Sequence, residues 1–340
     1  MTAEPKPMLN WSALPKVELH LHMDISLSFE AAVQLNPSLT QEVYARDFVA
    51  PAKCNSLGDF LTRAPRVLEL LQTVFSLQIL AQDVFRQLAE DNVVYAELRF
   101  APLLHTQKGL SPQEIVRTVE AAIDRASHDT GIDSRLILCS LRHFSTEQSL
   151  QTVQLIDQFR GSRVVAFDLA GDEAGYPLMP HLEAFRFAEA HHIPITSHAG
   201  EASGAQSVWD TLDLLRPSRI GHGVRSIEDP TLVQHLKQEQ IHLEICPTCN
   251  VQLDVFPTFA DHSVDSLHRQ NVSLSISTDN RTLTPITLTQ EYDNLVANFG
   301  WSKVDFLKCN ISAINAAFLL PSVREDLMRR VTQGYETIKF

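Results

Sequence analysis

Two histidines separated by one residue are the first sign of chemistry in this chain. His20 and His22 lie in residues 17–22, where apolar and polar side chains alternate. Such alternation is typical of a β-strand, whose side chains at positions i and i+2 point the same way. Histidine is the commonest metal ligand, so the pair predicts half of a metal site. Two unrelated histidines on a polar strand face are the simpler alternative.

Side chains that could bind a metal or transfer a proton also follow several other segments whose sequence pattern predicts strands. A single polar residue in such a place is usually a cap or a turn residue. Histidine and carboxylate residues at five strand ends are hard to explain by turns alone. The histidines and carboxylates in question are Asp168, His198, Glu201, His222, Glu244 and Asp279, and Gly171 and Asn280 lie close to them in the same strand-end segments.

Three histidines, two from the first strand and one from a later strand end, form a donor set for a divalent ion together with one carboxylate. Imidazole nitrogen and carboxylate oxygen suit zinc, and four such ligands leave a position for water. The expected ligands are His20, His22, His198 and Asp279.

Two further residues could take part in proton transfer. Glu201 comes three residues after His198, where a carboxylate could shuttle a proton beside a metal. Its alternative role is to offset a helix dipole. His222 lies between two glycines at the end of another predicted strand, although a lone histidine is more often structural.

The elements that must position these residues alternate along the chain. Eight segments read as strands, namely 17–22, 93–100, 136–140, 164–169, 193–197, 219–222, 241–245 and 272–277. Helical periodicity occupies 111–127, 147–159, 180–191, 208–215 and 230–239. Alternating strands and helices predict parallel strands, and eight such units predict a closed (β/α)8 barrel. Active sites of such barrels lie at the carboxyl ends of the strands.

The first crossover, residues 25–91, is unusually long and is expected to be a helical lid insertion within one barrel domain of residues 1–340. A helix is expected over residues 56–72. Packing on the outside of the barrel is the alternative to a lid. A helical region over 289–335 is expected to complete the barrel wall.

Composition excludes several classes of protein. The net charge of −13 argues against a nucleic-acid-binding surface. Five scattered cysteines fit reduced thiols in a cytoplasm better than a disulfide framework. Residues 1–16 contain no apolar core of a signal peptide, and no run approaches the ~20 apolar residues of a membrane span. The expected protein is cytoplasmic, with no membrane or nucleic-acid partner; its oligomeric state is left open.

Taken together, the motifs resemble the adenosine deaminase family of the amidohydrolase superfamily. The matching segments occur in order over nearly the whole chain: PKVELHLHMD at 15–24, VAFDLAGDE at 165–173, SHAGE at 197–201, IGHG at 220–223, EICP at 244–247 and STDN at 277–280. The resemblance implies hydrolytic deamination of adenosine and 2′-deoxyadenosine to the inosine product and ammonia. A zinc-activated water would attack purine C6.

The resemblance also implies roles for single residues. Glu201 would protonate purine N1, and His222 would orient or deprotonate the water. Gly171 would offer backbone to the purine, and Asp24 would contact the ribose. Asn280, where the family commonly has Asp, would donate to purine N7, which an amide does without needing protonation. Zinc would be held by His20, His22, His198 and Asp279.

Two departures from the family pattern leave the substrate open. Ile25 follows Asp24 where the family commonly has Gly, and Ala64 stands where an aromatic residue is frequent. Ala64 would give space to a larger 5′ substituent. The alternatives are adenine, methylthioadenosine, aminodeoxyfutalosine and N6-methyl-AMP; Asp24 favours a nucleoside over adenine.

Three rival interpretations have weaker support. Cys246 and Cys249 form a C-x-x-C beside an H-x-E, but not with the spacing of base deaminases. A two-metal barrel hydrolase usually carries a bridging lysine after strand four, and no lysine lies between Lys108 and Lys237. A non-catalytic barrel would not be expected to retain every candidate catalytic residue.

Overall fold

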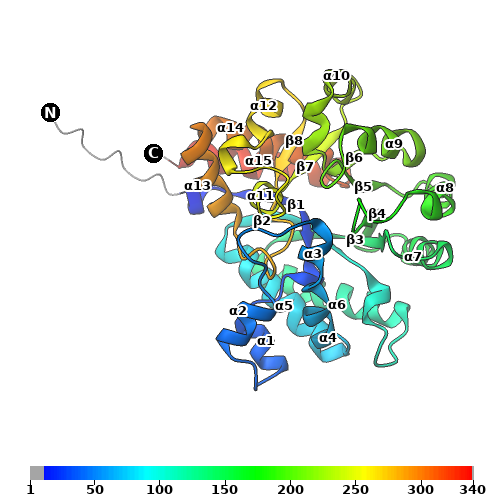
Figure 1. Cartoon of the computed structure of the whole chain (residues 1–340). Coiled ribbons are helices and arrows are strands. Elements are labelled where there is room, and N and C mark those ends of the chain that lie inside the picture. Colours follow the sequence, from blue (N-terminus) through cyan, green and yellow to red (C-terminus); the bar gives the residue numbers. More distant parts are fainter. Residues whose placement is uncertain (1–10, 339–340) are drawn as a thin grey trace.

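Eight parallel strands form the centre of the structure, a computed structural model that describes residues 11–338. The strands are β1 Lys16–His22, β2 Val93–Phe100, β3 Asp133–Leu141, β4 Val164–Ala170, β5 Thr196–Ala199, β6 Arg219–His222, β7 His242–Ile245 and β8 Leu274–Ile276. They confirm the predicted (β/α)8 barrel (Figure 1). β5 and β8 begin later than the sequence pattern predicted.

The barrel consists of two four-stranded halves joined by short bridges. The strand orders are β1-β2-β3-β4 and β5-β6-β7-β8. Phe167 bridges to Ile195 on one side, and Leu21 bridges to Asp279 on the other. At the second junction the backbone N–H of Asp279 donates to the carbonyl of His20 at 3.0 Å. The closure of the barrel therefore places Asp279 beside the histidines of β1.

Helices surround the strands, and their ends carry clear sequence signals. In α6, Pro112–Thr130, Ser111 and Glu114 form a capping box at the start. Gly131 ends the helix in the left-handed region, with φ of 71°. The other helices that follow strands are α7 Thr146–Gln158, α8 Leu182–Ala190, α9 Ala205–Leu215, α10 Pro230–Gln238, α11 Pro247–Gln252 and α12 Val264–Arg269.

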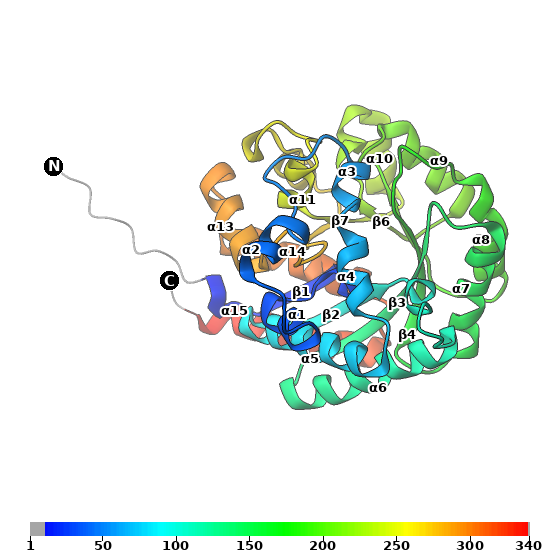
Figure 2. The same cartoon turned by 60° about the horizontal axis from the view of Figure 1, so that its bottom comes forward.

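The insertion between β1 and β2 holds five helices: α1 Phe29–Leu35, α2 Gln41–Asp47, α3 Leu57–Leu61, α4 Ala64–Leu70 and α5 Val74–Glu90. The single helix predicted over 56–72 is wrong, because α3 and α4 are separate. Pro65 explains the break, since it has no N–H to donate to Leu61 and its ring would clash with that carbonyl. Figure 2 shows α3 and α4 crossing over the strand ends.

The carboxyl-terminal region is helical, as predicted, with α13 Leu288–Phe299, α14 Lys303–Ala316 and α15 Pro321–Thr337. Asn310 of α14 accepts a hydrogen bond from the backbone of Val17, which ties this region to β1. In residues 11–338, no single helix is long and apolar enough to cross a membrane; only α3 and α4 taken together with α5, a sharply bent combination, meet the criteria of length and composition. The expectation about a signal peptide rests mostly on residues 1–10, which lie outside the described residues.

Candidate active site

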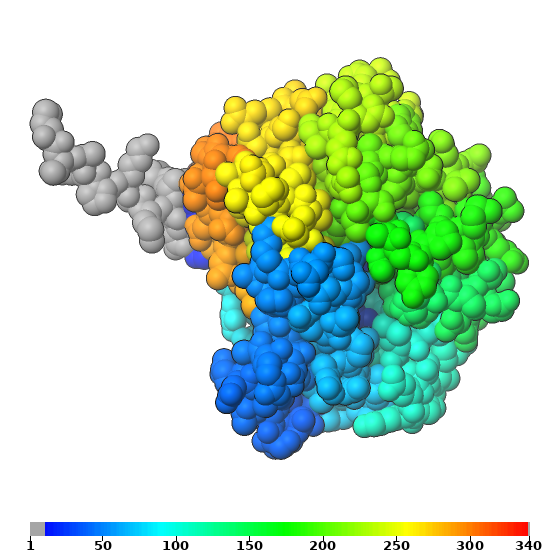
Figure 3. Space-filling model, in the orientation of Figure 1, coloured from blue at the N-terminus to red at the C-terminus, as the bar shows by residue number. Residues whose placement is uncertain are grey.

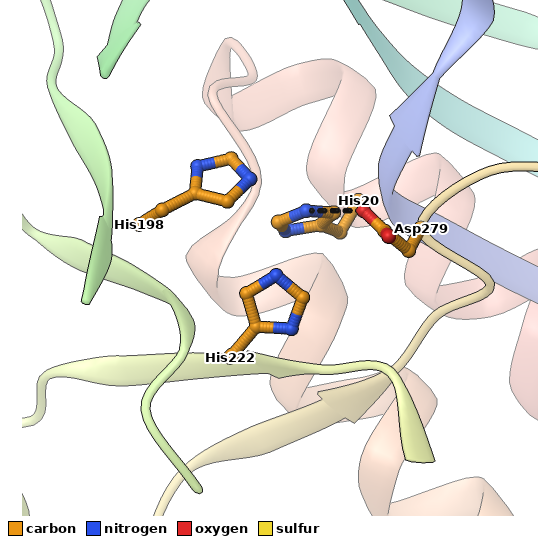
Figure 4. A group of neighbouring side chains, drawn as sticks. All are labelled: His20, His198, His222 and Asp279. Atoms are coloured by element: carbon orange, nitrogen blue, oxygen red, sulfur yellow. Dashed lines mark ion pairs between the residues drawn. The ribbon is translucent and has the colours of Figure 1, made fainter. Parts of the chain in front are cut away.

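The strand ends bring a compact group of ring nitrogens and a carboxylate together. His20 of β1, His198 of β5, His222 of β6 and Asp279 each offer one ligand atom, and these atoms lie within 4.8 Å of one another (Figure 4). Figure 4 shows the three rings facing a common centre. Four distant parts of the sequence therefore converge at one point of the barrel mouth.

His22 lies at the edge of this group. Its Nε2 is 3.0 Å from Nε2 of His198 and 3.6 Å from Oδ1 of Asp279. All four predicted metal ligands, together with His222, thus meet in one place. The structure offers four imidazoles and one carboxylate, one donor more than the predicted set.

Two of the rings are oriented by carboxylates behind them. Nδ1 of His20 lies 2.8 Å from Oε2 of Glu244, and Nδ1 of His198 lies 3.1 Å from Oδ1 of Asp168. Nε2 of His20 is buried and makes no hydrogen bond within residues 11–338, although Oδ1 of Asp279 is 3.2 Å away. A buried nitrogen without a hydrogen bond, facing other donors, fits a divalent ion and its usual ligand chemistry.

Arg99 of β2 joins the two orienting carboxylates. Its guanidinium donates to Asp168 at 3.0 Å and to Glu244 at 2.5 Å, and all three side chains are fully buried. Burial alone would raise the pKa of Glu244, but Arg99 and Arg219 hold it well below its ordinary value. Both carboxylates therefore stay ionised and accept hydrogen bonds from the rings.

Glu201 lies in the same site and is 5% exposed. Burial raises the pKa of its carboxyl well above the ordinary value, and the charges of Asp279 and Glu173 add to the rise. Its Oε1 accepts a hydrogen bond from Asn250 of α11 at 3.1 Å. A carboxyl held protonated in this way is suited to act as a general acid.

Glu173 fixes the loop that carries Glu201. Its carboxylate accepts hydrogen bonds from the hydroxyl of Ser207 and from four consecutive backbone N–H groups, those of Gly200, Glu201, Ala202 and Ser203. Glu173 belongs to the motif at residues 165–173, but the sequence alone indicates no role for it. Only its place beside Gly171 could have drawn attention to it.

Two site residues have strained backbones. His222 and Asp279 adopt φ values of 62° and 65°, which are uncommon for residues other than glycine. Asp279 is held on its second oxygen by the thiol of Cys249 at 3.0 Å and by the amide of Asn280 at 2.9 Å. Such strain at a cluster of polar groups is typical of functional sites.

A cavity of about 420 Å³ opens over this cluster. Its wall includes His22, Glu201 and His222 from the strand ends and Leu57 and Phe60 from α3. The volume is in the range of small-molecule sites. A larger cavity of about 1100 Å³ lies on the opposite side of the barrel and contains none of the clustered residues, so the smaller cavity is the candidate site.

The predicted lid lies against the barrel mouth. Leu57, Phe60 and Leu61 all line the cavity, as does Ala64. At Gly58 an added Cβ would lie 3.4 Å from Oδ2 of Asp172, so α3 approaches the segment after β4 closely. In Figure 3 the blue surface of this region meets the green surface of that segment.

The predicted substrate contacts differ in their positions. Asp24 and Gly171 line the cavity. Asp24 accepts a hydrogen bond from the backbone of Ala101 at 3.0 Å, and Gly171 has φ of 96°, a value that favours glycine. Asn280 is not among the lining residues; its oxygen accepts from Leu283 and its amide bonds Asp279.

The C-x-x-C pair is not a second metal or redox site. Both cysteines are free and buried, and burial raises the pKa of each thiol well above its ordinary value. The thiolate needed for metal binding or redox exchange is therefore disfavoured. Cys249 instead donates to Asp279.

Comparison with known proteins decides the family. The sequence model described as adenosine deaminase matches residues 15–334. An adenosine deaminase of Enterococcus faecalis is 37% identical over 328 residues, which are 95% of this chain and 97% of that protein. The chain belongs to the adenosine deaminase family. It is accordingly a hydrolase that acts on C–N bonds, and the family's metal dependence fits the His/Asp cluster.

Solved structures related to the family share the fold. Arabidopsis ADAL in complex with IMP has a TM-score of 0.86 and 25% identity, covering 96% of this chain and 99% of that one. The adenine deaminase of Arthrobacter aurescens has a TM-score of 0.88 and 24% identity, covering 95% of this chain and all of that one. These likenesses show that the chain shares the barrel fold of both proteins.

Proposed function

We propose that the chain catalyses the hydrolytic deamination of adenosine and 2′-deoxyadenosine, releasing ammonia and the corresponding inosine. Curated relatives named adenosine deaminase, at 31–37% identity over most of the chain, support this assignment. The observation that carries it is the shared cavity, in which the buried carboxyl of Glu201 faces the His/Asp cluster.

One divalent ion would be held at the cluster by His20, His22, His198 and Asp279, and zinc suits these ligands best. The carboxylates behind His20 and His198 support this arrangement, because they turn the other nitrogen of each ring toward the centre. When bound, the ion supplies Lewis acidity that makes water nucleophilic near neutral pH.

Glu201 and His222 would handle the protons of the reaction. Donation from Glu201 to purine N1 makes C6 electrophilic, so that water adds there. The raised pKa of Glu201, caused mainly by burial, favours the protonated carboxyl that this donation requires. His222 would orient the attacking water or take its proton, and the amino group leaves as ammonia once it has gained a proton.

The cavity lining favours a nucleoside over a nucleotide. Among the described residues, no lysine or arginine lines the cavity, whereas the carboxylates of Asp24 and Asp172 do. A 5′-phosphate would meet no cation there and would be repelled by these charges. Asp24 would bond the ribose, and Gly171 would offer its backbone to the purine. Asn280 would donate to N7 only after its amide leaves Asp279, to which it donates at 2.9 Å.

The insertion of residues 25–91 would act as the lid of a single catalytic domain. Ile25 and Ala64 both line the cavity, which supports methylthioadenosine or another 5′-modified nucleoside as the alternative substrate. The cysteines within residues 11–338 are all free, which supports a cytoplasmic location.

A panel of substrates tests the assignment. Ammonia release would be measured with adenosine, 2′-deoxyadenosine, adenine, methylthioadenosine, aminodeoxyfutalosine and N6-methyl-AMP. The proposal expects the highest kcat/KM for the two unmodified nucleosides. A clear preference for adenine or N6-methyl-AMP would contradict it, and a preference for methylthioadenosine would select the alternative.

A further inference from the structure

His222 differs from His20 and His198 in the group that its Nδ1 faces. Nδ1 of His20 and of His198 faces a carboxylate, which only accepts, so both rings carry their proton on Nδ1. Nδ1 of His222 faces the side-chain amide of Asn250, with Nδ2 of Asn250 at 3.2 Å. Figure 4 shows the other nitrogen of His222 directed toward His20 and His198.

The proton on His222 depends on which end of the Asn250 amide it meets, and a backbone group decides this. The N–H of Val264 donates to Nδ1 of His262 at 3.0 Å. A backbone N–H can only donate, so Nδ1 of His262 carries no proton, and the neutral ring carries it on Nε2. This group is 3.3 Å from Oδ1 of Asn250, which therefore accepts.

With Oδ1 occupied in this way, the two amide hydrogens of Asn250 have two separate destinations. Nδ2 lies 3.1 Å from Oε1 of Glu201 and 3.2 Å from Nδ1 of His222. Each can accept one hydrogen. Rotating the amide by half a turn would set Oδ1 against the oxygen of Glu201 and the NH2 group against the N–H of His262, two repulsive contacts.

The competing arrangement gives His222 a proton on Nδ1. That proton could then point at Oε1 of Glu201, 3.3 Å away. It would also meet the amide hydrogens of Asn250 head-on, in a site where Asn250 is fully buried. Unpaired buried donors cost roughly 1–3 kcal/mol each, so this arrangement is disfavoured.

We infer that Asn250 and His262 are positioning residues that hold His222 with its proton on Nε2. His222 then presents a hydrogen-bond donor to the reaction centre, where His20 and His198 present lone pairs. It orients the attacking water and does not bind the metal, while the proton that the water loses passes to the carboxylate of Glu201 once that group has protonated purine N1. Asn250 also occupies Oε1 of Glu201, which leaves Oε2 to carry the acidic proton. The catalytic meaning of this arrangement rests on the proposed function; the arrangement itself does not.

Histidine-ring ¹⁵N NMR of the full chain reads the tautomers directly. Spectra of metal-free and zinc-loaded protein would be compared, with His222 assigned by its loss in His222→Gln. His222 is expected to show a protonated Nε2 and a bare Nδ1. His20 and His198 are expected to show the reverse and serve as internal references. A protonated Nδ1 on His222 would overturn the inference, whether or not the protein deaminates adenosine.

Substitution of Asn250 gives a second, independent test. Asn250→Asp replaces the donor by an acceptor, so His222 should move its proton to Nδ1, and kcat should fall by about 100-fold or more while KM changes less. The bare Nε2 of His222 would then face the metal, and the absorption spectrum of cobalt-loaded protein should change. Asn298→Asp, an exposed site with the same change of charge, should alter none of these properties.

Variants of His262 separate positioning from packing. His262→Gln keeps an acceptor for Val264 and a donor for Asn250, so it should retain the tautomer and most of kcat. His262→Leu removes the donor, and the ring of His222 should then show a mixture of tautomers with reduced kcat. Equal kcat and equal spectra for the two variants, or an unchanged tautomer in Asn250→Asp, would contradict the inference.

Discussion

At the scale of single residues, the hydrogen-bond partner behind an imidazole decides whether the ring directs a lone pair or a proton toward the centre of the site. A carboxylate behind His20 turns a lone pair toward the centre, and a carboxylate behind His198 does the same. The partners themselves are held ionised by Arg99. The residues one step away from the cluster therefore set its chemistry as much as the cluster does.

Glu244→Gln tests this dependence on the orienting groups. The amide can still accept from His20, but it loses the negative charge that makes the ring a better ligand. Zinc affinity, measured by competition with a chelator, should fall by about 10–100-fold. Glu291→Gln controls for the same change of side chain at a buried position, since Glu291 is equally buried but bonds Thr248 and no ring. Equal affinities in the two variants would remove Glu244 from this role.

Glu201→Gln tests the general acid. The amide keeps the shape of the side chain but cannot give up a proton to the substrate. We expect kcat for adenosine to fall by about 10²–10⁴-fold with the metal content unchanged. Glu189→Gln, on the outer surface of α8, should leave kcat as it was. A Glu201→Gln enzyme as fast as the parent would refute the mechanism.

At the scale of elements, the site depends on a loop whose backbone N–H groups are held by hydrogen bonds to a carboxylate. Glu173 accepts four consecutive N–H groups of the loop after β5, so replacing one oxygen by NH2 sets a donor against donors. Glu173→Gln should lower the free energy of unfolding by about 1–3 kcal/mol and reduce kcat. Urea unfolding and steady-state kinetics would measure both effects. A variant with normal stability and kcat would show that the hydrogen bonds of Glu173 to the loop are dispensable.

The strands and the candidate ligands could be predicted because their signals are local. Alternation marks residues 17–22, and short motifs end the strands that carry His198, His222 and Asp279. Partners such as Asn250 and Glu173 could not be identified, because their roles depend on which loops meet in space. The break between α3 and α4 was missed although Pro65 is visible in the sequence, since an apolar face at helical spacing continues across it.

At the scale of the whole molecule, buried carboxylates make stability depend on pH. Burial raises the pKa of Glu291 to about 8 from 4.5. Between these values the folded state holds a proton that the unfolded state has lost, so stability should fall as pH rises through this window, by up to about 1.4 kcal/mol per pH unit from this group. Unfolding measured from pH 5 to 8 should give a shallower decline in Glu291→Gln. An identical decline in both proteins would exclude this group as the source.

At the scale of the whole molecule, the barrel mouth brings the candidate metal ligands beside the candidate cavity, and a metal titration tests most directly the proposal that one ion acts there. Metal-free protein would be titrated with Zn²⁺ while the loss of adenosine absorbance is followed. The account predicts no turnover without metal and a linear rise that ends at one ion per chain. Turnover in the metal-free protein, or a rise that ends only at two ions per chain, would contradict it.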